Sequence, residues 1–571
     1  MMTKPIPRRL WSHWQWLVVM AMTGLSTMAA GQAHPLADET PAQREARLQW
    51  WREARFGLFI HWGPVSLKGT EIGWSRGGER RGYGSAGTEI PVEVYDKLYK
   101  EFNPTRFDAR EWVAIAKAAG MKYMVFTSRH HDGFSMFDTQ ASDHKITNPQ
   151  SPYRRDVVKQ LADACQEAGL RFGLYYSQPD WHHPDAFTDR HDRYLEYLRA
   201  QVRELLTNYG PLDVLWFDGL GKSATDYGAE ALNRMVRELA PSILINNRNG
   251  LPEDFDTPEQ VIGKFQNTRP WESCITICEQ WAWKPNDRLK SLAECLQTLV
   301  RCAGGDGNLL LNVGPMPDGR IEPRQVERLQ EIGAWLERYG TSIYATRGGP
   351  FKPGKWGAST YRGNTIYLHL FGPRTSPLML PAIGTPVIGC SVLTGGDAQV
   401  QQTSDGITVL VPQAHVQPTD TIVVLELGGP AGGIAPIALP SLSLAAGKPA
   451  RASNVFQDHE LYAAAKAVDD DAETRWATDG GTKTAWLEVD LGQPTTVGRA
   501  AIAEAYAGRV RRFELQFKDG DNWQTALAGT AIGEHFAASF APITARWVRL
   551  NILQATEGPT VWEFQLFPPE K

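Results

Sequence analysis

The stretch PLDVLWFDGLG, residues 211–221, contains an apolar run that ends at a single carboxylate. Val214 to Phe217 are apolar, Asp218 follows at once, and Gly219 comes next. A short, near-continuous apolar run is typical of a strand that is buried on both faces of a parallel sheet. The stretch therefore predicts an inner strand with Asp218 at its carboxyl end. A lone Asp in that place usually closes a turn or caps a helix. Whether Asp218 has a functional role therefore depends on which other residues the fold brings next to it.

Similar apolar runs recur between residues 50 and 345, and helical patterns separate them. The predicted strands are 56–63, 122–130, 171–177, 213–218, 242–248, 260–265 and 308–314. Helical patterns such as AREWVAIAKAAG (109–120) and RRDVVKQLADACQEAG (154–169) lie between them and end at glycine, as helices prefer. Strands that alternate with helices in this way predict an α/β fold, a (β/α)8-like barrel within residues 34–345.

Polar side chains gather at the carboxyl ends of the predicted strands. They are His61, His130, His131, Tyr176, Trp181, Asp218 and Arg248. In a β/α barrel these strand ends meet at one mouth, which is where active sites lie. Because the other polar residues are expected at the same mouth, a functional role for Asp218 is favoured over a role in a turn.

The pattern changes after residue 345. Short alternating strands with Gly and Pro turns, such as TIYLHLFG and TIVVLELGGP, predict an antiparallel β-sandwich over residues 346–430. Residues 431–440, rich in Gly, Pro and Ala, are predicted to be a linker. Residues 441–571 are again all β and predict a second β-sandwich of the jelly-roll kind.

The N-terminus has the pattern of a secretory signal. Residues 1–33 contain Lys4, Arg8 and Arg9, then an apolar segment, then small residues up to Ala33. We expect a periplasmic or secreted protein with no membrane anchor after cleavage; an uncleaved anchor is the alternative, but the apolar run is short for a spanning helix. The net charge of −5 and the lack of a long basic run argue against nucleic acid. The six cysteines suggest buried thiols or at most one disulfide.

Three histidines and a carboxylate at one mouth could form a metal centre. However, adjacent histidines on a strand point in opposite directions, so His130 and His131 would not both face one ion. No recognised spacing of acidic ligands accompanies them. Histidines that form hydrogen bonds to a polyhydroxylated ligand, with aromatic walls beside them, explain the same residues more simply.

The motifs together resemble one family. FGLFIHWG, TSRHHDGF, YYSQPDW, VLWFDG and PWESCITICEQWAW, in this order, resemble the glycoside hydrolase family 29 α-L-fucosidases over roughly residues 45–430. The resemblance implies a retaining exo-glycosidase that removes terminal α-L-fucose from fucosylated glycans by double displacement through a covalent fucosyl-enzyme. Two alternatives remain: a fucose-binding, lectin-like protein without catalysis, and a retaining glycosidase of another galacto-configured sugar.

The resemblance also implies roles for individual residues. Asp218 would be the nucleophile, and Arg248 would help to keep it ionised. The acid/base is Glu259 in DFDTPEQ or Glu272 in RPWESC. Glu259 is preferred, because the family carries this group on a variable segment between the nucleophile strand and the WE motif; Glu272 would otherwise support the site from behind.

The sugar contacts follow in the same way. His61, His130 and His131 would bind hydroxyl groups, with Trp62 and Glu71 nearby, and Tyr176 would contact the nucleophile or the ring. Phe59, Trp216 and Trp281 would form an apolar corner for the C6 methyl group, and this corner would disfavour a sugar with a hydroxyl there. The segment 75–89 departs from the family in being short and rich in glycine.

The C-terminal segment resembles another known module. AAKAVDDDAETRWAT, AWLEVDLGQPTTV and VWEFQLF resemble discoidin-like (coagulation factor C-type) domains, which makes residues 441–571 a candidate carbohydrate-binding module or a structural appendage. The resemblance implies a structural calcium ion held by Asp469, Asp471, Thr474 and Glu563, since hard oxygen donors suit Ca²⁺. A solvated acidic turn is the alternative. No cofactor is expected for catalysis.

Overall fold

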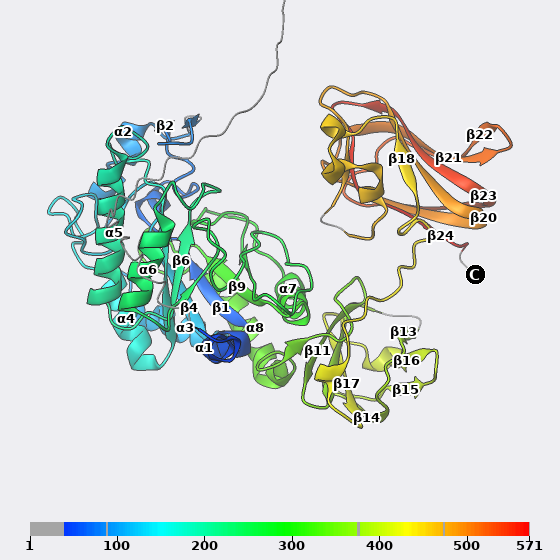
Figure 1. The fold of residues 1–571 in the computed structure, drawn as a ribbon, viewed down its shortest axis with the longest axis horizontal. Helices are drawn as coiled ribbons and strands as arrows, with labels where there is room; N and C mark the ends of the chain where they lie inside the picture. The colour runs from blue at the N-terminus through cyan, green and yellow to red at the C-terminus, as the bar shows by residue number, and fades with distance from the viewer. Residues whose placement is uncertain (1–38, 87–88, 374–376, 472–473, 570–571) are drawn as a thin grey trace, which may run out of the picture. The chain divides into compact units, whose positions relative to one another are not determined.

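The computed structural model describes residues 39–86, 89–373, 377–471 and 474–569, so the predicted signal segment 1–33 lies outside the described residues. The chain forms two compact units, Met1–Pro436 and Ile437–Lys571 (Figure 1). Within the described residues, no helix has the length and apolarity needed to cross a membrane. All six cysteines are free, and five of them are buried.

The first unit is built on a seven-stranded parallel sheet with the strand order β7-β6-β5-β4-β1-β9-β8. Its strands are β1 (Phe56–Ile60), β4 (Tyr123–Arg129), β5 (Arg171–Ser177), β6 (Val214–Asp218), β7 (Leu244–Ile245), β8 (Glu272–Thr276) and β9 (Asn308–Val313). Neighbours in chain order are neighbours in space from β4 to β7, and the first strand pairs with the last. This is the arrangement of a (β/α)8-like barrel, and the predicted fold class is confirmed.

Residues 254–260 connect the two edges of this sheet. Asp254 donates its backbone N–H to Ile245 O of β7, and on the other side Gln260 donates to Cys274 O of β8. Parallel bridges join Asn246 to Phe255 and Glu259 to Cys274. The prediction of a strand at 260–265 was wrong: the segment that closes the barrel lies earlier, and Val261 is 46% exposed. The strand β8 was not predicted, because its polar sequence ESCIT lacks an apolar run.

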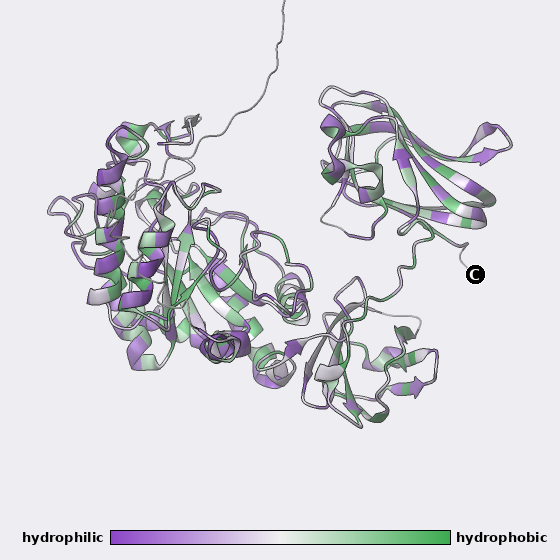
Figure 2. Ribbon diagram, viewed as in Figure 1, coloured by the Kyte–Doolittle hydropathy of each residue, from purple (hydrophilic) through white to green (hydrophobic). Residues whose placement is uncertain are grey.

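The helices that cover the sheet are α3 (Ala109–Ala118), α4 (Val157–Ala168), α5 (His191–Asn208), α6 (Ala229–Leu239), α7 (Leu292–Gly304) and α8 (Pro323–Tyr339). The two predicted helical patterns are confirmed as α3 and α4, and α4 ends at Gly169 in the left-handed conformation. Figure 2 shows the reason for this layering: the strands are mostly hydrophobic, whereas helices such as α5 carry hydrophilic residues.

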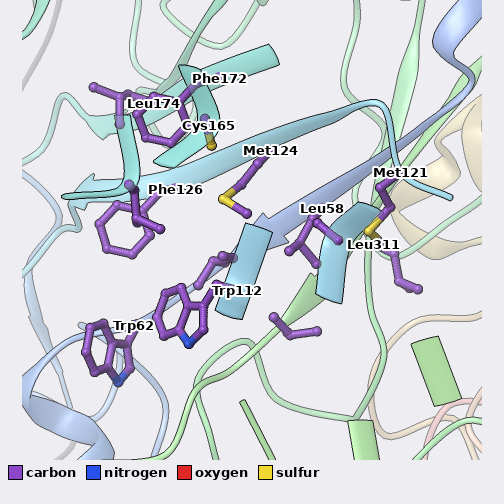
Figure 3. Close-up of a cluster of buried hydrophobic side chains, with 14 of the residues drawn as sticks. Leu58, Trp62, Trp112, Met121, Met124, Phe126, Cys165, Phe172, Leu174 and Leu311 are labelled. Atoms are coloured by element: carbon purple, nitrogen blue, oxygen red, sulfur yellow. The ribbon is translucent and has the colours of Figure 1, made fainter. Parts of the chain in front are cut away.

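Two separate apolar layers result. The layer between strands and helices contains Leu58, Trp62, Trp112 and Phe126 (Figure 3). The layer inside the barrel contains Phe59, Val125, Tyr175, Trp216 and Leu310. Helix α1 (Pro41–Ala54), which begins with a Thr40–Gln43 capping box, contributes Leu48 and Trp51 to the inner layer. Since Trp51 binds residues at the first positions of β8 and β9, α1 closes the amino-terminal end of the barrel.

A short hairpin and a β-sandwich complete the first unit. The hairpin consists of β2 (Gly78–Glu79) and β3 (Ser85–Ala86), and α2 (Val92–Tyr95) follows it. The sandwich has a sheet of β10 (Arg347–Gly348), β11 (Gly357–Arg362), β12 (Thr365–Leu370), β17 (Thr421–Leu427) and β14 (Val387–Val392). A second sheet has β13 (Leu378–Pro381), β16 (Gly406–Leu410) and β15 (Gln399–Gln402).

The second unit is an all-β domain, as predicted. Its main sheet follows the order β19 (Trp476–Ala477), β24 (Thr560–Phe567), β20 (Ala485–Glu504), β23 (Phe536–Ala555), β21 (Val510–Asp519) and β22 (Asn522–Gly529). A further strand, β18 (Ala450–Ala452), pairs with β20. Trp476, Phe513 and Phe564 are fully buried in its core.

Candidate active site

Asp218 is the last residue of β6, at the carboxyl end of the barrel, and is only 7% exposed. Its Oδ2 accepts a hydrogen bond from Tyr175 Oη at 2.9 Å and lies 3.6 Å from His131 Nε2. Its Oδ1 lies 3.5 Å from Arg248 Nη1 and accepts no hydrogen bond within the described residues. The carboxylate is thus held by one oxygen while the other remains available for chemistry.

Arg248 joins Asp218 to the second predicted carboxylate. Its Nη1 donates to Glu259 Oε2 at 2.6 Å, and its other nitrogens bind the side chain and backbone of Thr257. Burial opposes the charge of Arg248, but the neighbouring Asp218 and Glu259 outweigh it and raise the pKa of the guanidinium above its usual value. Because contacts of 2.6 Å and 3.5 Å share one nitrogen, the two carboxylate oxygens lie at most about 6.1 Å apart.

Glu272 lies at the other end of the barrel. It is the first residue of β8, whereas Asp218 is the last residue of β6, and all strands of this sheet run parallel. Glu272 is completely buried and accepts hydrogen bonds from Trp51, Tyr123 and Trp216. Burial raises the pKa of this carboxyl to about 7. Of the two candidates for the acid/base, the structure brings Glu259 to the mouth and leaves Glu272 beneath it.

The environment of Glu272 predicts a change of stability with pH. A carboxyl whose pKa is higher in the folded than in the unfolded protein stabilises the fold below pH 4.5 and loses this contribution as the pH rises to about 7. We therefore compare the free energy of unfolding of Glu272→Gln with that of the unmodified protein. The difference, variant minus unmodified protein, should become more favourable to the variant by about 3 kcal/mol between pH 4.5 and pH 8. Urea unfolding across this range measures the difference. A difference that does not change with pH would mean that Glu272 titrates normally.

The three predicted histidines lie together and are neutral. Ring centroids are 5.6 Å apart for His61 and His130, and 4.1 Å apart for His130 and His131. Burial lowers the pKa of His61 and of His131 to about 3, and that of His130 well below its usual value. Neutral imidazoles each offer one donor and one acceptor, so the cluster suits hydroxyl groups.

Fixed partners determine which nitrogen is free in two of the three histidine rings. Asn312 donates its Nδ2 to Trp281 O, so its Oδ1 must accept from His61 Nδ1 at 2.7 Å. Likewise Ser177 donates to Pro179 O, so its oxygen accepts from His131 Nδ1 at 2.6 Å. The Nε2 atoms of His61 and His131 are consequently left as hydrogen-bond acceptors. They would bind hydroxyl groups that donate.

The three predicted aromatic residues also lie together. Phe59 contacts Trp216 at 5.3 Å and Trp281 at 6.0 Å between ring centroids. Phe59 and Trp216 are each 1% exposed, so they form the floor of the site, whereas Trp281 is half-buried and lies 4.8 Å from the His61 ring. The result is an apolar corner beside the histidines.

Two of the predicted contacts were wrong because the side chains point out of the barrel. Tyr176 donates to Gln201 of α5, and it is Tyr175, one residue earlier, that binds Asp218. Trp62 packs in the outer layer against Trp112 and donates to Met316 O (Figure 3). Successive side chains of a strand point to opposite faces, so an error of one position moves a side chain to the other face.

Glu71 acts on the site through a loop. Its carboxylate accepts backbone hydrogen bonds from Trp281 and Ala282 at 2.9 and 3.1 Å, and burial raises its pKa. These bonds position Trp281. The resemblance implied that Glu71 lies near the sugar; in the structure its carboxylate binds the backbone of the loop that carries Trp281.

Several residues of the mouth were not predicted as site residues. They are Tyr175, Ser177, Asn312, Trp74 and Arg80. Tyr175 and Ser177 are two residues apart on β5 and therefore point to the same face of the sheet. Counting in steps of two along each strand would have found them. Trp74 and Arg80 come from the segment around the β2–β3 hairpin, whose position no strand pattern predicts.

The predicted calcium ligands lie in a turn of the second unit. Thr474 Oγ1 donates to Asp469 Oδ1 and Oδ2, each at 2.8 Å, and the backbone oxygen of Asp471 accepts from Thr474 N. Lys466 Nζ lies 3.4 Å from Asp469 Oδ2. Glu563, on β24, is 7% exposed. Among the described residues, no group of three or more His, Cys, Asp or Glu side chains could hold a metal ion.

The barrel and the carboxylate pair at its mouth define a glycoside hydrolase. Comparison with known proteins narrows the class: the model of the α-L-fucosidase family matches residues 25–341, and that of the F5/8 type C domain matches residues 449–564. The chain belongs to the α-L-fucosidase family. The resemblance predicted from its motifs, and the discoidin-like resemblance of its C-terminal domain, are confirmed.

Individual relatives agree. Human plasma α-L-fucosidase is 30% identical over 369 residues, 58% of this chain and 78% of the relative. The structure of α-L-fucosidase isoenzyme 1 from Paenibacillus thiaminolyticus is 37% identical with a TM-score of 0.61, and covers 67% of this chain and 99% of its own. An α-L-fucosidase from Bacteroides thetaiotaomicron, trapped as a covalent intermediate with 2-fluoro-fucosyl fluoride, is 27% identical with a TM-score of 0.59 and covers 67% and 96%.

Proposed function

We propose that the chain is a retaining α-L-fucosidase with Asp218 as nucleophile and Glu259 as acid/base. The observation that carries this proposal is the single Arg248 nitrogen that contacts both carboxylates. Retaining glycosidases keep their two carboxyl groups about 5–5.5 Å apart and inverting ones about 6.5–9.5 Å apart. An upper limit of about 6.1 Å between the two contacting oxygens fits the first class.

In the first step, Asp218 attacks the anomeric carbon and the bond to the leaving oxygen breaks. Glu259 gives its proton to that oxygen. In the second step, the ionised Glu259 takes a proton from water, and the resulting hydroxide displaces Asp218 from the sugar. Arg248 remains beside both groups and limits the repulsion between them.

The rest of the mouth accounts for the sugar. Neutral His61 and His131 offer acceptor nitrogens to hydroxyl groups, and the corner of Phe59, Trp216 and Trp281 suits a C6 methyl group. A C6 hydroxyl in this corner would lose its hydrogen bonds with water, which disfavours galacto-configured sugars that carry one. The presence of both carboxylates argues against a lectin-like protein.

The test compares purified protein on two substrates. We expect turnover of an aryl α-L-fucoside and at least 100-fold lower kcat/KM for an aryl β-D-galactoside, and NMR should detect α-L-fucose as the first product. Turnover of neither substrate contradicts the enzyme, β-L-fucose as the first product contradicts the retaining mechanism, and preference for the galactoside contradicts the sugar.

For the second unit we propose a structural Ca²⁺ at the turn of Asp469, Asp471 and Thr474. The donors are hard oxygens, which is the kind that Ca²⁺ prefers. An ion at Asp469 would displace the Lys466 ammonium. If the ion is bound, EDTA should lower the Tm of this unit and added Ca²⁺ should restore it, whereas Asp469→Ala should be insensitive to both. A Tm that EDTA does not change in the unmodified protein contradicts the site.

Export of the chain by its N-terminal segment remains a prediction.

A further inference from the structure

A cavity of about 400 Å³ lies beside Asp218 on the side of Arg248. Its lining residues are Asp218, Leu220, Gly221, Lys222, Asn247, Arg248, Gly250 and Thr257. The histidines and Trp281 are not among them. Arg248, which lines the cavity, also binds Glu259, the group that would protonate the leaving oxygen. The leaving group would therefore extend into this cavity.

Two cations stand on aromatic rings at the mouth, and one of them, Lys222, lines this cavity. Lys222 Nζ lies 4.9 Å from the ring centroids of both Tyr83 and Phe187. The Arg80 guanidinium lies 4.8 Å from the Trp74 ring and 4.9 Å from the Trp181 ring. Such contacts align a cation without neutralising its charge.

The turn of the β2–β3 hairpin places the two cations at the site. Tyr83 Oη donates to Gly219 O, next to Asp218, at 2.8 Å. Tyr83 N donates to Arg80 O within the same turn. On the other side of the turn, Trp74 and Trp181 contact the ring of His131. The hairpin is thereby attached to the catalytic strand end rather than to an unrelated surface.

Neither cation has a carboxylate partner among the described residues. Arg248 forms ion pairs with Asp218 and Glu259 at the mouth, whereas no pair within 4 Å in the described parts of the chain involves Arg80 or Lys222. Arg80 donates to Trp74 O, and its Nε is buried without a hydrogen-bond partner. Asp226 is near enough to feel the charge of Lys222, but its carboxylate binds the backbone and hydroxyl of Ser223. Lys222 and Arg80 are therefore held by aromatic rings and hydrogen bonds instead of by a direct carboxylate contact among the described residues.

We propose that this cavity binds a leaving group that carries an anion, either a sulfate ester or a uronic acid carboxylate, and that Lys222 with Arg80 recognises it. The inference rests on the proposed fucosidase function, because it concerns the group that the reaction releases. An anion on the leaving group would form a charge-assisted contact with Lys222 in the cavity and with Arg80 of the neighbouring hairpin turn.

The test uses matched pairs of aryl α-L-fucosides with charged and neutral leaving groups. One pair carries a carboxylate or a carboxamide on the ring, and the other carries a sulfonate or a sulfonamide. We expect kcat/KM to be at least fivefold higher for the charged member of at least one pair, and this advantage should shrink in 0.5 M NaCl because salt screens exposed charges. The pair that shows the larger advantage identifies the type of anion.

Variants connect the preference to the cations. We expect Lys222→Met to lower the ratio of charged to neutral kcat/KM at least fivefold, Arg80→Gln to lower it as well, and Lys222→Arg to retain it. Lys122→Met is the matched control, because Lys122 also stands on an aromatic ring, 4.3 Å from Tyr344, but precedes the first residue of β4 at the opposite end of the barrel. Its ratio should not change.

The outcomes separate this inference from the proposed function. Equal kcat/KM within both pairs, or a ratio that Lys222→Met and Arg80→Gln leave unchanged, overturns the anion site while the turnover of neutral fucosides still supports a fucosidase. Failure to hydrolyse any of the four fucosides overturns the proposed function itself.

Discussion

Asp218→Ala should lower kcat/KM for an aryl α-L-fucoside by about 10⁴-fold or more, as the loss of a nucleophile does in other hydrolases. The fold should remain, because the substitution removes one side-chain hydrogen bond, from Tyr175 Oη to Oδ2, while Oδ1 accepts none within the described residues and Arg248 keeps Glu259 and Thr257 as partners. We expect the free energy of unfolding to change by no more than about 1 kcal/mol. Steady-state kinetics and urea unfolding of the same preparation measure both quantities.

Azide distinguishes a lost nucleophile from a damaged site. In Asp218→Ala the space of the carboxylate can admit azide, which should restore turnover and yield β-L-fucosyl azide, since a single displacement inverts the anomeric centre. Near-normal kcat in the absence of azide would mean that another group attacks the sugar.

Glu259→Ala should lower kcat about 10²–10⁴-fold for a sugar leaving group, because that group cannot depart without a proton. The loss should be much smaller for an activated aryl leaving group, which needs little protonation. Added azide should produce α-L-fucosyl azide, since the covalent intermediate is still formed and azide then replaces water in the second displacement. Kinetics with both types of substrate and NMR of the azide product measure these effects.

Glu272 provides the comparison. It is fully buried at the amino-terminal end of the barrel and binds three donors there, so Glu272→Gln should not give a fucosyl azide. Formation of α-L-fucosyl azide by the Glu272 variant, and not by Glu259→Ala, would reverse the assignment. Failure of both variants to form it would leave neither glutamate as the acid/base.

The positions of the strands could be predicted wherever a buried strand leaves an apolar run in the sequence. The strands β1, β4, β5, β6 and β9 each contain an apolar run and were found in the sequence, as was the polar residue at the end of β6. The segment 254–260 and β8 were missed, since their residues satisfy backbone hydrogen bonds of the barrel without forming an apolar run. The face of the sheet to which a side chain points was harder to predict than the position of its strand. Tyr176 was predicted to contact the site, but Tyr175 binds Asp218 and Tyr176 binds Gln201.

The sequence by itself determined the class of the protein: a parallel barrel from its apolar periodicity, a polar mouth from the residues that end its strands, and a family from the order of its motifs. Only the tertiary structure showed which of the two glutamates lies near Asp218. Glu259 and Glu272 are 13 positions apart in the chain, but one meets the Arg248 that also contacts Asp218 and the other lies beneath the site. The reason is physical: strand order and direction bring distant residues together, and separation along the chain does not measure that distance.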